Sequence, residues 1–445
     1  MKYESIKSML LVVLVLVSFV LTWSLWTYQP KYEFIQNTKY IQDVSVSNRK
    51  VEVSSLIQPV KILYHQNDQH FGTTETVTQN KLMEEMKNWN FSDITNISSS
   101  IADDEFLSFI HGSGNLELVY SDELPMNVFQ SIFQISNEDV RYASFDRLVI
   151  HMDEDKHDKV TAYFVSYENN KIYEAQVKNA SIQTFEEINH QMENEYQRYL
   201  SFDLTETKKI FLPADNFTMY RLQYYTDLMD PNTFKNALFS DPTYVKKDFL
   251  PSGEVYTDGS RLMRIDSDQL MMQYVNPASA DEYRSETSTL IQSSIDYVND
   301  HGGWTDTYRF SSWDSFEQKT VFRLYSNNYP VYSSNGMSEI IQVWGNNEIF
   351  KYERPLFNLD LRLDRGKLPI TLPSGIEVIE VLREMKDFDP ELLEDITIGY
   401  ELVSDPLKSK VFILEPIWSF RYAGSWNKVI FNQSDESGGN VIGLE

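Results

Sequence analysis

The chain has 445 residues, of which 42% are hydrophobic and 24% charged, and this balance is typical of a folded protein. Asp and Glu number 66 against 39 Lys and Arg, giving a formal net charge of -27. So acidic a surface repels phosphate groups, which excludes sequence-independent nucleic-acid binding. The absence of cysteine excludes disulfides, thiol catalysis and Cys-ligated zinc or iron–sulfur centres. The length allows about three domains of ordinary size.

The amino terminus carries an uncharged segment of 23 residues, 8–30, that is rich in Leu and Val. As a helix it would extend roughly 34 Å, enough to cross a hydrocarbon core of about 30 Å. Lys2 and Lys7 precede it, which orients this end toward the cytoplasm. Its far end carries Trp23, Trp26 and Tyr28, which favour the outer interface. We expect a cytoplasmic tail at 1–7, a transmembrane anchor at 8–30 and an extracellular remainder.

A cleaved secretory signal peptide is the alternative interpretation of this segment. Such a peptide has a shorter apolar core and ends at a cleavage site formed by small residues. Here the first alanine of the chain is Ala102, and bulky aromatic residues occupy the region where cleavage would occur. No later apolar run is long enough to span a bilayer, so the sequence favours an uncleaved, single-pass anchor in the cell membrane.

One face of the predicted anchor carries residues spaced alternately four and three positions apart. They are Leu11, Val15, Ser18, Thr22 and Leu25. Ser18 and Thr22 form a small-x-x-x-small pair, which permits a partner helix to approach closely. We expect this stripe to contact partner helices within the membrane. The alternative is that the two hydroxyls lie in a lipid-facing helix and bond back to its own carbonyls.

The extracellular part alternates helical and strand patterns, which predicts an α+β fold with mixed sheets. We place an N-terminal domain at residues 31–204, a central domain at 205–300 and a C-terminal domain at 301–445. The order strand, helix, strand, strand occurs in both of the last two regions. This repetition indicates that the central and C-terminal domains share a fold.

The N-terminal domain begins with a helical pattern over residues 82–89. Residues 148–177 then predict three strands, the first two joined by an acidic turn at 153–158. A long amphipathic helix follows, for which Thr184 and Glu187 would form a capping box.

The central domain opens with a strand up to Leu212, and a helix then begins at Asp230 as N-cap with Pro231 in its first turn. Three short strands follow before a stop at Asn276-Pro277. A further helix is closed by the glycines of His301-Gly302-Gly303.

The C-terminal domain begins with a β-meander that turns at Asn327-Asn328. Pro330 indicates that its strand lies at a sheet edge, because proline cannot donate a ladder hydrogen bond. A helix then opens at Ser374, with Glu377 completing a capping box, and two long strands end the domain.

No catalytic motif accompanies these elements: G-x-S-x-G, a phosphate loop, G-x-G-x-x-G and H-E-x-x-H are all missing. The best metal-like cluster runs from His151 to Asp158, but a solvated hairpin tip explains it better. His65 and His70 flank a polar stretch and are interpreted as surface histidines. His111, followed by Gly-Ser-Gly, is interpreted as part of a turn. We therefore predict neither catalytic residues nor metal ligands, and no cofactor.

Several segments of this sequence, taken in order, resemble the YycH family of Firmicutes. They are KSMLLVVLVLVSFVLTWSLWTYQP at the amino terminus, YTDGSRLMRIDSDQLMMQYVNP, LPSGIEVIEVLREM and the closing FILEPIWSF. The resemblance covers the chain from end to end and includes its length and single-pass topology. The resemblance is specific because the four segments occur in the same order. No single one of them is a catalytic or ligand-binding motif.

This resemblance implies a membrane-anchored, non-enzymatic regulator of an essential two-component system that governs cell-wall metabolism. The implied partners are the sensor histidine kinase WalK, also called YycG, and a similar anchored protein, YycI. It also implies three extracellular domains, the last two alike and matching the YycI exterior. The alternative is an anchored extracellular cell-wall enzyme or scaffold with an unrecognised site.

Overall fold

The computed structural model describes residues 7, 11, 13, 15–19, 50–136, 143–152, 160–280, 287–345, 348–363, 368–408, 410–431 and 442–443. The chain divides into one unit at Met1–Asp43 and a second at Val44–Glu445. The described residues between 7 and 19 are helical. Among all described residues, no helix combines the length and the apolar character needed to cross a membrane. Most of the predicted anchor at 8–30 lies outside the described residues.

The described part of the second unit contains a first sheet of ten strands. Their order is β10-β9-β2-β1-β4-β6-β7-β8-β3-β5, and β3–β5 is a parallel pair in an otherwise antiparallel sheet. The strands are β1 (Lys61–Gln66), β2 (Gln69–Thr73), β3 (Asn90–Asn96), β4 (Asn115–Pro125), β5 (Gln134–Ile135), β6 (Ser144–Met152), β7 (Val160–Ser166), β8 (Lys171–Lys178), β9 (Gln197–Asp203) and β10 (Lys209–Pro213). The three strands predicted over 148–177 are thereby confirmed, and the turn at 153–158 lies outside the described residues.

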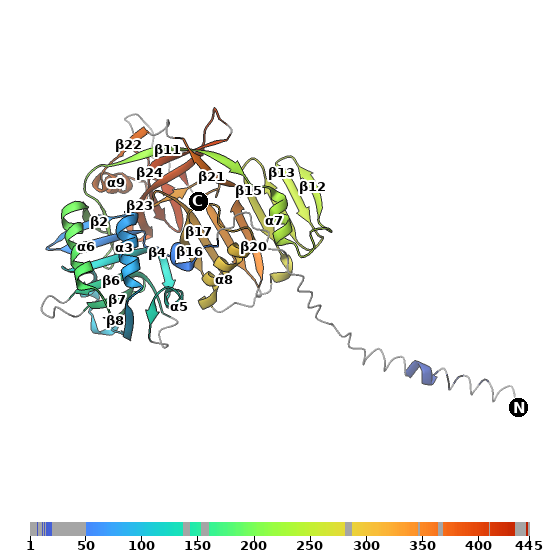
Figure 1. The fold of residues 1–445 in the computed structure, drawn as a ribbon, viewed down its shortest axis with the longest axis horizontal. Helices are drawn as coiled ribbons and strands as arrows, with labels where there is room; N and C mark the ends of the chain where they lie inside the picture. Colours follow the sequence, from blue (N-terminus) through green and yellow to red (C-terminus); the bar gives the residue numbers. More distant parts are fainter. Residues whose placement is uncertain are drawn as a thin grey trace. The chain divides into compact units, whose positions relative to one another are not determined.

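Two helices, α3 (Thr76–Met86) and α6 (Ile182–Glu195), lie side by side against this sheet (Figure 1). Their apolar faces enter the core through side chains that include Met86 and Ile188, both fully buried. The predicted capping box of α6 is wrong, because its N-cap is Ser181, whose hydroxyl accepts a hydrogen bond from the Thr184 backbone. Shorter helices are α2 (Val53–Leu56), α4 (Phe106–Ile110) and α5 (Met126–Gln130).

The second sheet has sixteen strands within the described residues. Its main path is β12-β13-β14-β15-β20-β19-β17-β18-β23-β24-β11-β21. The strands are β11 (Phe217–Leu228), β12 (Lys246–Leu250), β13 (Gly253–Thr257), β14 (Leu262–Asp266), β15 (Met271–Val275), β16 (Tyr308–Asp314), β17 (Lys319–Ser326), β18 (Tyr329–Tyr332), β19 (Glu339–Trp344), β20 (Ile349–Pro355), β21 (Phe357–Arg362), β22 (Leu368–Leu372), β23 (Leu393–Ser404), β24 (Val411–Tyr422), β25 (Ser425–Lys428) and β26 (Ile442–Gly443).

The helices of this region follow the predicted start and stop signals. In α7 (Pro231–Leu238), the Asp230 side chain accepts a hydrogen bond from the Asn232 backbone. In α9 (Gly375–Arg383), Ser374 and Glu377 form the predicted capping box. After α8 (Thr287–Asp300), Gly302 and Gly303 have positive φ angles of 109° and 70°, as a glycine stop requires.

Pro330 does not mark a sheet edge. Its strand β18 lies between β17 and β23, and Pro330 is paired in register with Tyr325. The strand is only four residues long, and its parallel pairing with β23 begins at Val331. Pro330 lies before the residues of β18 that pair with β23. An inner strand can therefore contain this proline, because its missing N–H is not needed for that ladder.

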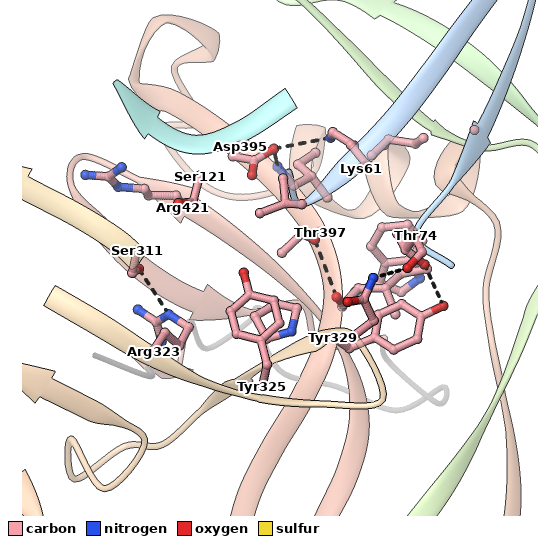
Figure 2. A pocket seen from close by; sticks show the side chains of 18 of the residues that line it. Lys61, Thr74, Ser121, Ser311, Arg323, Tyr325, Tyr329, Asp395, Thr397 and Arg421 are labelled. Atoms are coloured by element: carbon pink, nitrogen blue, oxygen red, sulfur yellow. Dashed lines mark hydrogen bonds and ion pairs between the residues drawn. The ribbon is translucent and has the colours of Figure 1, made fainter. Parts of the chain in front are cut away.

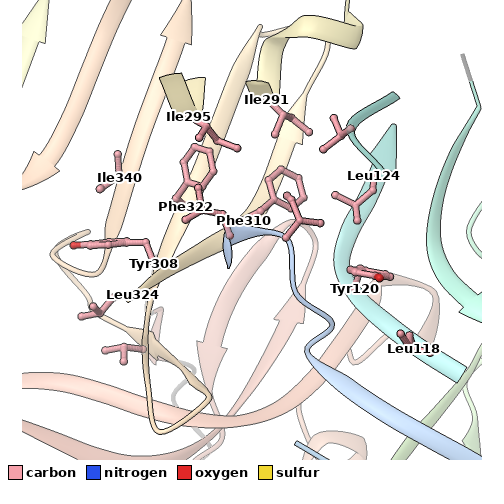
Figure 3. Close-up of a cluster of buried hydrophobic side chains, with 14 of the residues drawn as sticks. Leu118, Tyr120, Leu124, Ile291, Ile295, Tyr308, Phe310, Phe322, Leu324 and Ile340 are labelled. Carbon is pink, nitrogen blue, oxygen red and sulfur yellow. The ribbon is translucent and has the colours of Figure 1, made fainter. Parts of the chain in front are cut away.

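The two sheets share one hydrophobic core. Figure 3 shows Leu124 of β4 beside Phe310 of β16 and Ile291 of α8, with Tyr120 and Leu118 following further along β4. Hydrogen bonds cross the same contact, from the Ser121 hydroxyl to the Phe310 carbonyl at 2.9 Å and from the Trp313 indole to the Glu123 carbonyl at 2.6 Å. The sheets are therefore held together by a continuous apolar contact bordered by polar contacts.

The sheets do not follow the predicted domains strand by strand. The strand β10, which we assigned to the central domain, pairs with β9 in the first sheet. The long strand β11, which the sequence analysis missed, pairs with β24, β21 and β22 from the predicted C-terminal domain. The mixed α+β class with extensive sheet is confirmed, whereas the boundaries 31–204, 205–300 and 301–445 and the likeness of the last two domains stay predictions.

Candidate functional site

The described residues cover three members of the predicted partner-contact stripe. Leu11, Val15 and Ser18 are helical, and Leu11 and Val15 are 64% and 47% exposed. Thr22 and Leu25 lie outside the described residues. The stripe therefore stays a prediction.

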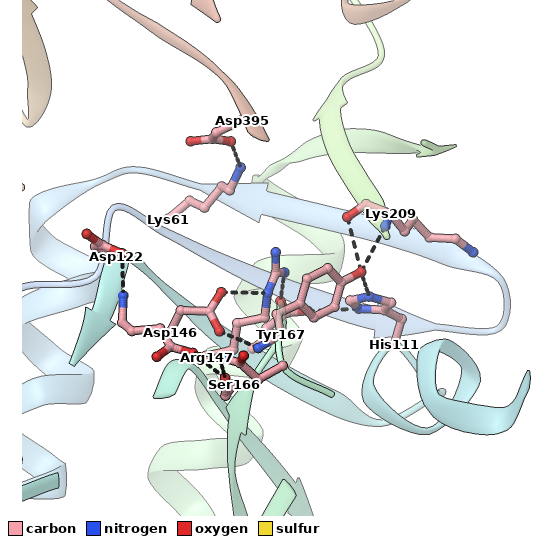
Figure 4. A network of polar contacts seen from close by, with 12 residues as sticks. Lys61, His111, Asp122, Asp146, Arg147, Ser166, Tyr167, Lys209 and Asp395 are labelled. Carbon is pink, nitrogen blue, oxygen red and sulfur yellow. Dashed lines mark hydrogen bonds and ion pairs between the residues drawn. The ribbon is translucent and has the colours of Figure 1, made fainter. Parts of the chain in front are cut away.

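A polar cluster is buried within the first sheet around Glu117 of β4. The Glu117 carboxylate is fully buried, and its Oε2 atom lies 3.0 Å from both His65 Nε2 and His111 Nδ1. Its other oxygen accepts a hydrogen bond from the Arg147 guanidinium. Arg147 lies over the Tyr167 ring, and the Tyr167 hydroxyl lies 3.0 Å from His111 Nε2 (Figure 4). The cluster thereby joins β1, β4, β6 and the turn after β7.

The environment of this cluster fixes its charge states. Burial by itself would raise the pKa of Glu117, but Arg147 and the two imidazoles outweigh it and hold this pKa well below its ordinary value. Burial lowers the pKa of His111 to about 4. Burial, with repulsion from His65 and His111, likewise lowers the pKa of His70 to about 4. His70 joins the cluster through its Nδ1, which lies 2.8 Å from His65 Nδ1. At neutral pH the cluster therefore contains a carboxylate, a guanidinium and the neutral imidazoles of His70 and His111, beside the imidazole of His65.

His65, His111 and Glu117 are the described residues placed closely enough to bind a metal ion, since their ligand atoms lie within 4.8 Å of one another. The arrangement does not fit a metal centre well. The Glu117 carboxylate already neutralises Arg147, whose charge would repel a cation. Because His65, His111 and Glu117 are buried, no open coordination position faces solvent. The group is better explained as a closed hydrogen-bond network.

The sequence analysis misjudged His65, which is 1% exposed, so its interpretation as a surface histidine is wrong. His111 lies in the turn that ends α4, as expected, and its side chain is buried. The available signal was Glu117, an acid between Leu116 and Leu118 in the otherwise apolar run of residues 116–120. The other candidate cluster, His151 to Asp158, lies mostly outside the described residues, and His151 Nδ1 lies 2.7 Å from Asn115 Oδ1.

A cavity of about 430 Å³ lies between the two sheets (Figure 2). The first sheet contributes residues of β1, β2, β9 and β10 to its wall, and the second contributes residues of β17, β18, β23 and β24. Phe211 connects the cavity wall to the Glu117 cluster, because its ring centroid lies 4.7 to 5.1 Å from those of His65, His70 and His111. No sequence motif marks this cavity, since its residues come from distant strands.

We expect Glu117→Gln to lower the free energy of unfolding by about 3–5 kcal/mol, because Arg147 would keep a buried charge without its counter-ion. Chemical denaturation of the purified protein measures this. The matched control is Glu187→Gln, which removes an exposed ion pair with Lys81 and should change the stability little. Equal losses in the two variants would contradict a structural role for the cluster.

Stability should fall as the pH decreases from about 6.5 toward 4. In this window the unfolded chain protonates His70 and His111, whereas the folded chain, with both pKa values at about 4, does not. Denaturation midpoints measured at several pH values test this. The variant His70→Gln removes one of the two groups and should show a smaller loss between pH 7 and pH 4.5. An unchanged slope would refute the assignment.

Removing metal ions should not affect folding, because a guanidinium already neutralises the Glu117 carboxylate. We expect thermal melts with and without EDTA to coincide. A lower Tm in EDTA that recovers on adding zinc would show instead that His65, His111 and Glu117 hold an ion.

Comparison of this sequence with known proteins identifies the protein family to which the chain belongs. The model of the YycH protein C-terminal domain matches residues 207–436, and that of the YycH protein N-terminal domain matches residues 4–195. A curated relative from Bacillus subtilis (strain 168), the two-component system WalR/WalK regulatory protein YycH, is 29% identical over 445 residues, covering 95% of this chain and 96% of its own.

The fold of this chain also matches that of a solved structure. The crystal structure of YycH from Bacillus subtilis superimposes with a TM-score of 0.75 at 26% identity, covering 86% of this chain and 98% of that one. Because the relative is a regulatory protein, the prediction that the chain is not an enzyme is confirmed. With family models matching most of its length, the chain belongs to the YycH family.

Proposed function

We propose that this protein regulates the sensor histidine kinase WalK (YycG) of a WalR/WalK two-component system. The observation that carries the proposal is the match of both YycH domain models, together with a relative that is named as a regulator of this system. The described sheets are consistent with a role in binding, since the one buried group with metal-ligand chemistry forms a closed network around Glu117.

In this proposal the protein sits in the cell membrane through residues 8–30, with its bulk outside the cell. Support comes from the uncharged run of 23 residues, the lysines before it and the aromatic residues at its far end. With Lys2, Glu4 and Lys7 set apart, the remaining chain carries 37 basic and 65 acidic residues. A part with that excess of acid is repelled by an anionic lipid surface, which leaves its faces available to protein partners.

The proposed contact with the kinase combines the helix stripe with the extracellular sheets, and a YycI-like anchored protein is the second partner. Within the stripe, Ser18 and Thr22 would permit close approach of a partner helix and a hydroxyl contact across the interface. Changes at this pair should therefore weaken the complex without altering the fold of the second unit.

Co-purification from detergent-solubilised membranes tests the proposal. We expect the full-length protein to retain the kinase. The double variant Ser18→Leu, Thr22→Leu should retain about threefold to tenfold less, because helix contacts of this kind contribute about 0.6–1.7 kcal/mol each. The helix stays apolar, so the amount of protein in the membrane should not change.

The matched control is Val13→Leu, Val17→Leu, which enlarges the opposite face with the same spacing. A loss equal to that of the stripe variant would show that the stripe has no special role. Absence of the kinase from the wild-type preparation would overturn the regulatory proposal. A mature amino terminus near Tyr32, found by sequencing the extracted protein, would overturn the anchor.

A further inference from the structure

We propose that the cavity between the two sheets is a binding site for a neutral saccharide of one or two rings. This site is distinct from the contacts proposed with the kinase and does not depend on them. Its volume of about 430 Å³ lies within the range of roughly 300–1,000 Å³ that is typical of small-molecule sites.

The wall formed by β17 is unusually polar for an inner surface. Lys319, Val321, Arg323 and Tyr325 alternate along this strand and all line the cavity, whereas Phe322 and Leu324 between them lie in the hydrophobic core. Alternation places Lys319, Arg323 and Tyr325 on one face of the strand. A face that only had to pack against the other sheet would be expected to carry apolar residues there.

Tyr325 is the side chain that most directly indicates a ligand. It is 6% exposed, and its hydroxyl makes no hydrogen bond to any residue within the described part of the chain. Figure 2 shows this hydroxyl pointing into the space between Arg421 and Thr397. A hydroxyl that faces a cavity and has no protein partner is available to hydrogen-bond a bound polar group.

The charges of the lining favour an uncharged ligand. Four basic side chains and four acidic side chains line the cavity. Lys61 pairs with Asp395 at 3.8 Å, Arg323 contacts Glu339, and Arg421 pairs with Glu394, just outside the lining, at 2.8 Å. Lys61 and Arg421 carry more N–H donors than these ion pairs use, so they can also donate hydrogen bonds to a ligand. The paired charges leave no net charge to attract an ion, and the net charge of -27 repels anions from the whole chain.

The aromatic residues of the lining indicate that the ligand contains a ring with apolar C–H faces. Trp426 and Tyr329 line the cavity and are half-buried, so part of each ring is accessible from it. The Trp426 indole N–H has no acceptor among the described residues, and the Arg323 guanidinium lies 5.9 Å from that ring. Accessible rings beside the Trp426 N–H suit a pyranose, whose C–H face packs on an aromatic ring while its hydroxyls take the hydrogen bonds.

Binding can be measured by ligand-observed NMR and calorimetry on the full-length protein in lipid nanodiscs, which contain no sugar-headed detergent. The probes are N,N′-diacetylchitobiose and cellobiose, with trialanine as a peptide of similar size. We expect saturable binding of at least one disaccharide and none of trialanine. Saturable binding of trialanine alone, or of no probe up to millimolar concentration, would overturn the proposal.

Two variants locate the site. Tyr325→Phe removes only the hydroxyl and should weaken disaccharide binding about fivefold to tenfold, as expected for the loss of one buried hydrogen bond. Ser312→Trp places an indole in the cavity and should abolish binding. The control Tyr244→Phe changes an exposed tyrosine and should bind like the wild type.

Thermal melts verify that each variant is folded. If the protein co-purifies with the kinase but binds no disaccharide, only the saccharide site is overturned. Failure of this proposal is therefore distinguishable from failure of the regulatory proposal. Disaccharide binding that is unchanged in both Tyr325→Phe and Ser312→Trp would place the sugar elsewhere and would also overturn it.

Discussion

The contact between β4 of the first sheet and β16 and α8 of the second region joins the two sheets into one core and borders the cavity between them. Leu124 lies beside Phe310 and Ile291, and Tyr120 and Leu118 belong to the same core, so the two sheets share one core. Apolar burial is non-directional and does not by itself fix how the two sheets align. The hydrogen bonds that border the apolar contact fix this alignment. The cavity borders this contact, since Ser121 of β4 and Ser311 and Ser312 of β16 also line it.

The Glu117 cluster is the second feature on which the first sheet depends. It places a carboxylate and a guanidinium where strands usually bury apolar side chains, and such an arrangement is stable only when every partner is present. The cluster reaches the cavity through Phe211, which contacts three imidazoles on one side and lines the cavity wall on the other. A change at Glu117 would therefore also alter the cavity wall.

Family membership and geometry contribute different parts of the functional account. The YycH family models and the Bacillus subtilis relative connect the chain to a two-component system. They assign no role to the cavity, which is defined by Tyr325, Arg323 and their neighbours. A ligand held by both walls of the cavity would stabilise one arrangement of the two sheets.

Local signals in the sequence were enough to predict many elements of this fold. The cap at Asp230 and the capping box of Ser374 with Glu377 were correct, because such signals act within a few residues. The long strand β11, the place of β18 inside the sheet and the burial of His65 could not be read locally, since each depends on strands distant in the chain. The cavity likewise depends on tertiary structure, because alternation along β17 groups Arg323 with Tyr325 but cannot reveal what the opposite sheet leaves open beside them.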